Sequence, residues 1–244
     1  MSDGDALLGA VDDRGIRELA LNRPDKANAL NAGIVRRLHA LLDEIGDETR
    51  VLVVKGAGRH FCGGFDFEGV EAQSEGDLVL RFVQINELLA RLRRAPYLTV
   101  AWVRGAAFGA GADIVCACAW RYGAARARFR FPGFQFGVAL GTRRLAELIG
   151  AQRAREVLAG NQTLDATAAH AAGLLSEVID EADFETRLAT LDAATAGLDR
   201  AARRALLRVT AGADHDADLA DLVRSVARPG IHERIARYRQ ATAA

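Results

Sequence analysis

The 244-residue sequence has no excess of either charge, because 32 Lys and Arg residues balance 32 Asp and Glu residues. Proteins that bind nucleic acid through its phosphates usually carry a basic excess, so this balance argues against that class. No apolar run reaches the roughly 18 residues that a membrane-spanning helix needs. The first ten residues also lack the basic and apolar segments of a signal peptide. We therefore expect a cytoplasmic protein with no nucleic-acid and no membrane partner.

Cysteine is scarce as well, with Cys62, Cys116 and Cys118 as the only three. Their odd number and the lack of a CxxC spacing argue against a disulfide framework and against a zinc site. We expect all three to be small buried residues, and we expect no metal. Half of the residues are hydrophobic, which is enough for one large domain or for a domain with a helical appendage.

Hydrophobic patterning predicts an alternation of strands and helices over the first half of the chain. Short apolar runs favour buried strands, and apolar residues at helical spacing favour helices between them. This order points to a parallel sheet with crossover helices, entered through a hairpin. After about residue 142 the pattern predicts almost only helices. The expected elements are strands at 6–10, 14–22, 51–54 and 98–103 and helices at 32–46 and 77–94, with a loop at 56–66.

Two glycine-rich turns follow successive buried strands. One is His60-Phe61-Cys62-Gly63-Gly64-Phe65-Asp66, and the other lies within Gly105–Trp120 (GAAFGAGADIVCACAW), a stretch that begins as a loop and ends as a helix. In the first turn we expect Phe61 to be buried and His60 to be an exposed loop residue. Small residues at a strand-to-helix turn bring main-chain N–H groups close to a ligand.

These turns allow two hypotheses. A dinucleotide-binding loop is weakly supported, because Ile114 stands at the third glycine position and no GxxxxGK[ST] motif occurs. A backbone oxyanion site would use N–H groups at a helix N-terminus, where the helix dipole adds positive potential. Two turns that donate to one point can hold a developing enolate or tetrahedral oxyanion. A single turn would indicate no more than a tight connection, but the pair favours the oxyanion hypothesis.

Four ordered segments carry a resemblance to a known family. They are 21–31 (LNRPDKANALN), 60–66, 104–114, and 158–160 together with 168–178. In this order they resemble the crotonase (enoyl-CoA hydratase/isomerase) superfamily, and the likeness covers almost the whole chain. The resemblance implies an α/β fold with a crotonase-like ββα spiral core at 1–190. It further implies a C-terminal helical trimerisation region at 191–244, and assembly as a homotrimer or a hexamer.

The same resemblance implies an acyl-CoA thioester substrate, so that coenzyme A enters as part of the substrate and no separate cofactor is needed. By position, the N–H groups of Gly63 and Ala110 would bind the thioester oxygen. Arg234 and Arg237 fall near the place where the C-terminal helix of family members contacts CoA, although solvated surface arginines are the alternative. The residues expected along the CoA path are Lys26, Ala27, Ala29, Gly64, Phe65 and Asp66.

The acid–base groups are the point at which the chain departs from the family. Hydratases of this family use two glutamates; one aligns with Asp113 and the other with Gly133. Asp113 lies at a helix start, where the dipole favours a charged carboxylate. It is either the catalytic acid or a favourable dipole partner of the helix. No carboxylate occurs between Arg121 and Arg144, so two-acid hydration is in doubt. Polar neighbours that could assist are Gln135, Arg130 and Tyr122.

We therefore predict an enoyl-CoA hydratase/isomerase-like enzyme of fatty acid metabolism that stabilises a thioester enolate and uses the single carboxylate Asp113. One alternative is a one-acid acyl-CoA thioester hydrolase or isomerase. Another is a catalytically weak acyl-CoA-binding subunit. The acyl chain is not specified, although several aromatic residues indicate either an apolar acyl pocket or ordinary core: Phe65, Phe67, Phe131, Phe134 and Phe136.

Overall fold

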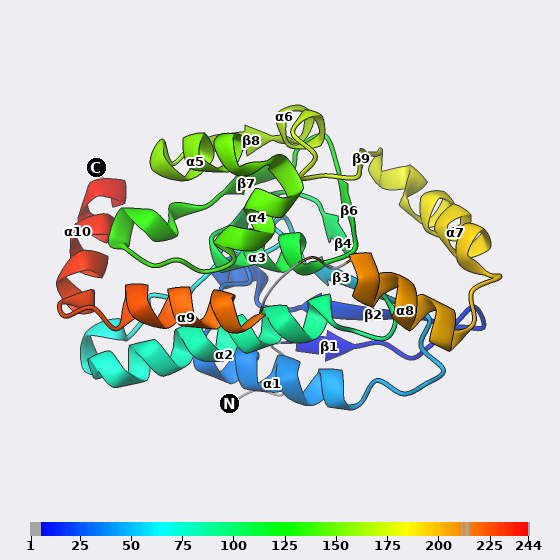
Figure 1. The fold of residues 1–244 in the computed structure, drawn as a ribbon, viewed down its shortest axis with the longest axis horizontal. Helices are drawn as coiled ribbons and strands as arrows, with labels where there is room; N and C mark the ends of the chain where they lie inside the picture. The colour runs from blue at the N-terminus through cyan, green and yellow to red at the C-terminus, as the bar shows by residue number, and fades with distance from the viewer. Residues whose placement is uncertain (1–5, 211, 213–214, 244) are drawn as a thin grey trace.

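A six-stranded sheet forms the centre of the computed structural model, which describes residues 6–210, 212 and 215–243 (Figure 1). Its strands run in the order β1-β2-β3-β4-β6-β9. Strands β1 and β2 pair antiparallel and the others pair parallel, so the predicted hairpin and parallel sheet are confirmed. The strands are β1 (Ala6–Leu8), β2 (Ile16–Leu21), β3 (Val51–Gly56), β4 (Leu98–Val103), β6 (Trp120–Gly123) and β9 (Glu177–Val178).

A smaller three-stranded sheet lies beside the first, and it was not predicted. It consists of β5 (Ala106–Phe108), β7 (Arg128–Arg130) and β8 (Thr163–Asp165) in the order β5-β7-β8. Strand β5 occupies part of the stretch that the sequence predicts to be a loop. Each of these strands has three residues, so their stability depends on pairing with distant segments rather than on a local pattern.

The helices follow the predicted pattern, with boundaries set by their caps. Helix α2 begins two residues earlier than expected because Ser74 and Asp77 form a reciprocal capping box. The helices are α1 (Ala32–Asp43), α2 (Glu75–Arg93), α3 (Ala110–Ala117), α4 (Thr142–Ile149), α5 (Ala151–Ala159), α6 (Ala166–Ala171), α7 (Phe184–Thr195), α8 (Arg200–Thr210), α9 (His215–Val226) and α10 (Ile231–Ala243), with 3₁₀ turns η1 (Pro24–Lys26), η2 (Val70–Ala72), η3 (Pro132–Phe136) and η4 (Glu181–Asp183).

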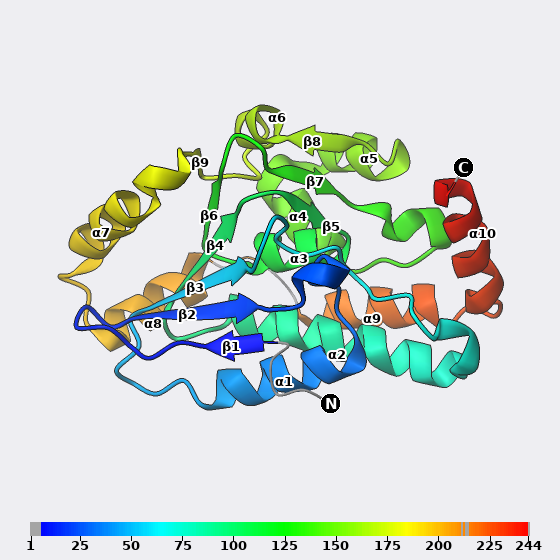
Figure 2. The same ribbon diagram turned by 180° about the vertical axis from the view of Figure 1, so that it is seen from behind.

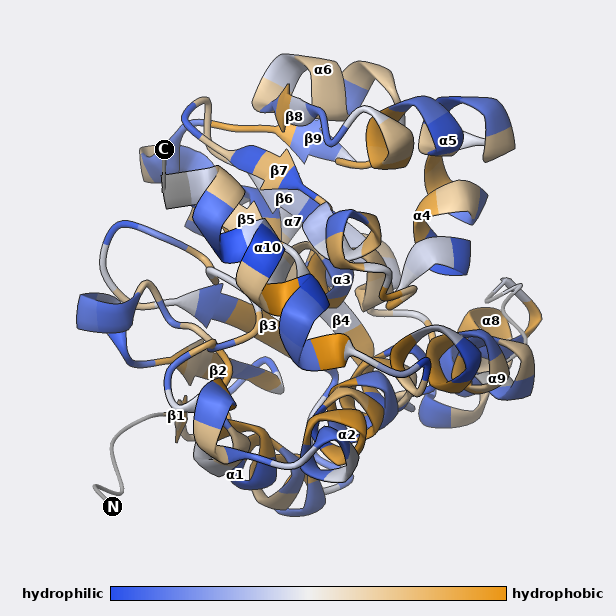
Figure 3. Cartoon of the chain, turned by 90° about the vertical axis from the view of Figure 1, so that its left-hand side faces the viewer, coloured by the Kyte–Doolittle hydropathy of each residue, from blue (hydrophilic) through white to orange (hydrophobic). Residues whose placement is uncertain are grey.

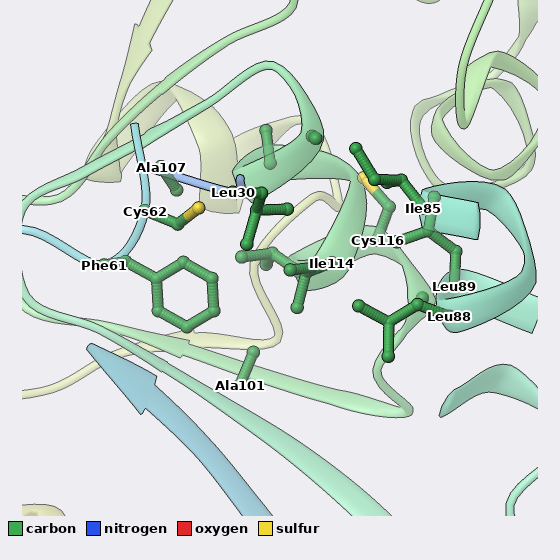
Figure 4. Close-up of a cluster of buried hydrophobic side chains, with 14 of the residues drawn as sticks. Leu30, Phe61, Cys62, Ile85, Leu88, Leu89, Ala101, Ala107, Ile114 and Cys116 are labelled. Atoms are coloured by element: carbon green, nitrogen blue, oxygen red, sulfur yellow. The ribbon is translucent and has the colours of Figure 1, made fainter. Parts of the chain in front are cut away.

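The large sheet is buried on both faces, as its apolar runs predict. Along β3, Leu52 and Val54 belong to one buried cluster, and Val51 and Val53 belong to the other. The first cluster contains residues of α1, α2 and α3, and the second contains residues of α7. Figure 2 shows β2, β3 and β4 from behind, and Figure 4 shows the first cluster with Phe61, Leu88 and Ile114 among its side chains. This core fixes the start of α3 relative to β3 and β4.

The last two helices pack against the rest of the chain. Helix α9 contacts α2, and α10 contacts η3. Figure 3 shows α10 in front of the sheet edges, with α1 and α2 below it and α5 and α6 above it. Among the described residues, no helix is both long and apolar enough to cross a bilayer. The division at 190/191 and the trimeric or hexameric assembly stay predictions. Residues 1–5 of the first unit and 211, 213–214 and 244 of the second lie outside the described residues.

Candidate functional site

Two turns lie against each other at the start of α3. The first contains Gly63 and Gly64, and the second leads from β5 through Gly109 into Ala110. Cys62 and Ala107 form a parallel bridge between them, and these two residues are neighbours in Figure 4. The two predicted glycine-rich segments, far apart in the sequence, therefore meet in the structure.

The close approach of the turns explains their small residues. A Cβ atom at Gly64 would lie 2.5 Å from the Phe108 carbonyl oxygen, and one at Gly111 would lie 2.4 Å from the Cys62 carbonyl oxygen. Gly64 also has a φ of 93°, a left-handed conformation that favours glycine. Each turn thus uses a missing side chain to admit the backbone of the other.

The two predicted N–H donors differ in their present partners. Within the described residues, the Ala110 N–H has no hydrogen-bond acceptor, as befits the first residue of a helix. The Gly63 N–H donates to the Ala27 carbonyl oxygen, with an N···O distance of 2.8 Å. Ala110 is therefore a free donor, whereas Gly63 must share its hydrogen or give up this bond to meet a ligand.

A cavity opens beside these turns. Gly63 and Ala110 both line it, together with Asp113 from the first turn of α3. Most of its wall is apolar, and the ring of Phe65 stacks on that of Phe82 with centroids 4.4 Å apart. All five aromatic residues that the sequence suggested for an acyl pocket lie on this wall. A largely apolar lining with a few polar groups is typical of a small-molecule site.

Asp113 is a buried carboxyl group at this cavity. It is 3% exposed, and among the described residues its Oδ1 atom has no hydrogen-bond partner. Burial raises the pKa of Asp113 well above its ordinary value, Arg144 lowers it, and Asp218 raises it further. The expectation that the helix dipole keeps this carboxyl charged is therefore outweighed by desolvation. The protonated form is favoured well above the pH at which an exposed aspartate ionises.

A buried ion pair that the sequence analysis missed lies behind Asp113. Arg144 of α4 and Asp218 of α9 are 3.0 Å apart, with side chains 1% and 4% exposed. No local pattern marks them as partners, since they come from distant helices. The pair connects α9 to the charge environment of Asp113.

The position of the second family acid is occupied by backbone contacts. Gly133 lies in η3, and a Cβ atom there would lie 2.6 Å from the Val138 carbonyl oxygen. Val138 in turn donates its N–H to the Gly133 oxygen. Within the part of the chain that the structure describes, Asp113 is the only carboxylate that lines the cavity.

The residues predicted for the CoA path lie on the segments around the first turn, and the two charged ones among them are already in ion pairs. Lys26 forms an ion pair with Glu68 at 3.0 Å, and Asp66 forms one with Arg23 at 2.8 Å. Burial raises the pKa of Asp66, but the hydrogen bond from Arg23 is among several interactions that bring it below the ordinary value. Of the six residues, Phe65 lines the cavity; Lys26, Ala27, Ala29, Gly64 and Asp66 do not.

The remaining candidates separate into one cavity residue and several others. Arg130 lines the cavity, whereas Tyr122 is buried in the second core cluster and Gln135 is exposed. The Arg234 guanidinium donates to five backbone carbonyl groups, so it braces the chain, and Arg237 is exposed.

Two further expectations concern the first turn and the cysteines. Phe61 is buried as predicted. His60 is half-buried rather than exposed, because its Nδ1 accepts a hydrogen bond from the Ala106 N–H at 3.3 Å. All three cysteines are free and buried, as expected.

Comparison with known proteins agrees with this fold. The model of the enoyl-CoA hydratase/isomerase family matches residues 12–227. The structure superimposes on a Bordetella parapertussis protein described as an enoyl-CoA hydratase/isomerase, with a TM-score of 0.92 and 40% identity over 97% of this chain and 98% of that one. The chain belongs to the enoyl-CoA hydratase/isomerase (crotonase) family, and its fold is the mixed α/β crotonase fold with C-terminal helices.

The names of individual relatives indicate different reactions. Ethylmalonyl-CoA decarboxylase of Mus musculus is 35% identical over 181 residues, which are 71% of this chain and 56% of that enzyme. The chain thus spans little more than half the length of that relative. A Mycobacterium tuberculosis protein described as an enoyl-CoA hydratase is 30% identical over 183 residues, which are 73% of each chain.

Proposed function

We propose that this protein binds an acyl-CoA thioester and moves a proton at the carbon next to the thioester, with an enolate as intermediate. The observation that carries the proposal is Asp113, the single carboxylate of the cavity among the described residues, which lies beside a free main-chain donor. This is hydratase/isomerase-like chemistry without the addition of water.

The steps follow from the two turns. The thioester oxygen accepts a hydrogen bond from the Ala110 N–H, at the positive end of α3. Gly63 serves as the second donor when its bond to Ala27 is shared or released. The Cα–H bond then breaks, the electron pair moves onto the thioester oxygen, and Asp113 takes the proton. The same proton returns to Cα, or to Cγ of an unsaturated chain, which completes an isomerisation.

The raised pKa of Asp113 gives this reaction a defined pH dependence. A carboxyl with a raised pKa is a stronger base once ionised, and it stays protonated, and so able to act as an acid, to a higher pH. Removal of a proton from Cα requires ionised Asp113, so the rate rises as the pH rises through the pKa of Asp113. Addition of water would require a second acid, and Gly133 leaves no room for one.

Decarboxylation of a 2-carboxyacyl-CoA is a second candidate, favoured by the protonated state of Asp113. Carbon dioxide leaves, its bonding pair forms the same enolate, and protonated Asp113 delivers its proton to Cα. This reaction requires the acid form, so its rate falls as the pH rises. The names of the mouse relative and of this chain's other decarboxylase relatives agree with this chemistry.

Exchange of substrate hydrogen for deuterium tests the proposal directly. Butyryl-CoA incubated with the protein in D₂O is expected to gain deuterium at Cα, as measured by mass spectrometry. Asp113→Asn should slow the exchange by about 10²–10⁴-fold, the usual contribution of a positioned acid or base. Asp43→Asn is the matched control, because Asp43 is an exposed aspartate at the end of α1.

Further substrates separate the alternatives. A 2-carboxyacyl-CoA that loses 44 mass units identifies decarboxylation, and release of free CoA identifies hydrolysis. Addition of 18 mass units to an enoyl-CoA at a rate above that of exchange would refute the proposal. Unchanged exchange in Asp113→Asn would refute the role of Asp113, and binding without any reaction would indicate an acyl-CoA-binding subunit.

A further inference from the structure

Arg130 is the one positively charged side chain among the described residues that line the cavity. It is the last residue of β7 and pairs in register with Phe108 of β5. Its carbonyl oxygen accepts a hydrogen bond from the Gly109 N–H at 2.8 Å. The backbone of Arg130 is therefore fixed next to the turn that presents the Ala110 N–H.

The guanidinium of Arg130 is oriented but not neutralised. Its Nε donates to Asn161 Oδ1 at 3.0 Å. Within the described residues no carboxylate lies within ion-pair distance of Arg130, and its two terminal nitrogens have no hydrogen-bond acceptor. Asn161 itself has a φ of 46°, which asparagine tolerates better than most residues. A polar side chain thus holds one edge of the guanidinium and leaves the other edge free.

The surroundings of Arg130 favour an anionic ligand. Asp113 does not supply the missing charge, since Arg144 and Asp218 are the charged groups that act on it. Tyr238 of α10 lines the same cavity and lies within electrostatic reach of Arg130, which opposes the effect of burial on the pKa of Tyr238. A lone cation with two free donors on an apolar wall is a strong receptor for a carboxylate.

We propose that Arg130 binds a carboxylate on the acyl chain, so that the preferred substrates are CoA thioesters of dicarboxylic acids. This inference rests on the proposed function, because it names the substrate class of the same site. The bound carboxylate is one that the product retains. An ion pair stabilises a carboxylate in the ground state and would slow its loss as carbon dioxide.

A phosphate group of CoA is the other anion that could reach a guanidinium. The acyl carboxylate fits better, because Arg130 shares the cavity with Asp113 and Ala110 and its neighbours there are aromatic. The residues predicted for the CoA path lie instead around Lys26 and Asp66, where an arginine and a lysine are already paired.

Binding measurements with a matched pair of ligands test the inference. Glutaryl-CoA and pentanoyl-CoA have acyl chains of equal carbon number and differ by one terminal carboxylate. Isothermal titration calorimetry with the intact protein should give a dissociation constant about 10–100-fold lower for glutaryl-CoA, the range expected for hydrogen bonds to a charged group. Arg130→Gln should remove this preference and leave pentanoyl-CoA binding within about threefold.

Arg128→Gln is the control. Arg128 lies two residues earlier in β7, is exposed and is outside the cavity lining, so the preference for glutaryl-CoA should persist. Glutaryl-pantetheine, which lacks the nucleotide, should keep the same dependence on Arg130. Arg130→Lys should restore part of the preference, because it restores the charge without the two-pronged donor geometry.

Several outcomes would overturn the inference. The first is equal affinity of the unaltered protein for the two ligands. The second is an equal loss of affinity for both ligands in Arg130→Gln. The third is a loss of affinity in Arg130→Gln that is absent with pantetheine esters, which would assign Arg130 to a phosphate of CoA. The affinity measurement does not depend on turnover. A protein that prefers glutaryl-CoA but exchanges no α-protons would therefore refute the proposed function and leave the role of Arg130 intact.

Discussion

Gly133 offers the sharpest test of why the second acid is absent. An added Cβ atom would lie 2.6 Å from the Val138 oxygen, so that oxygen must retreat by about 0.8 Å to reach the 3.4 Å of ordinary contact. Val138 is buried, and its N–H is bonded back to Gly133 at 2.9 Å. Movement of this carbonyl therefore strains a buried turn and weakens its closing hydrogen bond.

Gly133→Ala should lower the free energy of unfolding by about 1.5–4.5 kcal/mol, from roughly 1–3 for overpacking and roughly 0.5–1.5 for the weakened hydrogen bond. The melting temperature should fall by about 3–18 °C, at roughly 2–4 °C per kcal/mol for a chain of this size. Urea denaturation and thermal melting followed by circular dichroism measure both quantities. Gly197→Ala is the matched control, because no atom of the described residues lies within 4 Å of its added Cβ. The stability of this variant should change by less than about 1 kcal/mol.

Gly133→Glu extends the test to function. Because the side chain cannot enter without displacing Val138, the variant should be destabilised and should not add water to an enoyl-CoA. A Gly133→Ala protein that melts within a degree of the unaltered one would contradict the steric reasoning. A folded Gly133→Glu protein that hydrates crotonyl-CoA would show that one residue, rather than the shape of the turn, decides the reaction.

The other predictions concern the charges around Asp113. Burial raises the pKa of Asp113 in the folded state, so ionisation of this carboxyl lowers the stability of the fold above about pH 4, the pKa region of an unfolded carboxyl. Asp113→Asn should therefore be more stable than the unaltered protein at pH 7. In urea titrations this difference in stability should fade as the pH falls toward 4. A difference independent of pH would contradict this. Arg144→Met leaves the buried Asp218 without this cation and should cost about 3–5 kcal/mol, whereas Arg143→Met, at a side chain 48% exposed, should cost less than about 1 kcal/mol. Since Arg144 lowers the pKa of Asp113, its loss should shift the pH profile of α-proton exchange upward, and a profile that stays in place would refute the coupling.

The elements with a strong local pattern were predictable from the sequence. Helix α1 and strands β3 and β4 show clear apolar periodicity, and the structure places them within a few residues of the expected ranges. The turns at Gly63 and Ala110 were identified because their glycines and alanines are unusual after buried strands. The proximity of these turns came from the family resemblance, since spacing along the chain does not encode it.

What escaped prediction depends on contacts between distant segments. Strands β5 and β7 are three residues long and exist through mutual pairing. The bond from the Gly63 N–H to Ala27 joins two separate segments of one predicted site, so neither segment alone indicates that the donor is occupied. The protonation preference of Asp113 likewise follows from burial, which outweighs the helix dipole and is visible only in the folded chain.

The interlocked glycines of the two turns also bear on how this protein can diverge. The facing main chain occupies the space that a side chain at Gly64 or Gly111 would need, so a methyl group at either position collides with it. A side chain therefore cannot be added at Gly64 or Gly111 without moving the facing segment, so the relative placement of the two turns can change only as a unit. The aromatic wall has no such restriction, and Phe134 at its edge is 46% exposed. New acyl preferences can accumulate there while the chemistry at the turns stays the same.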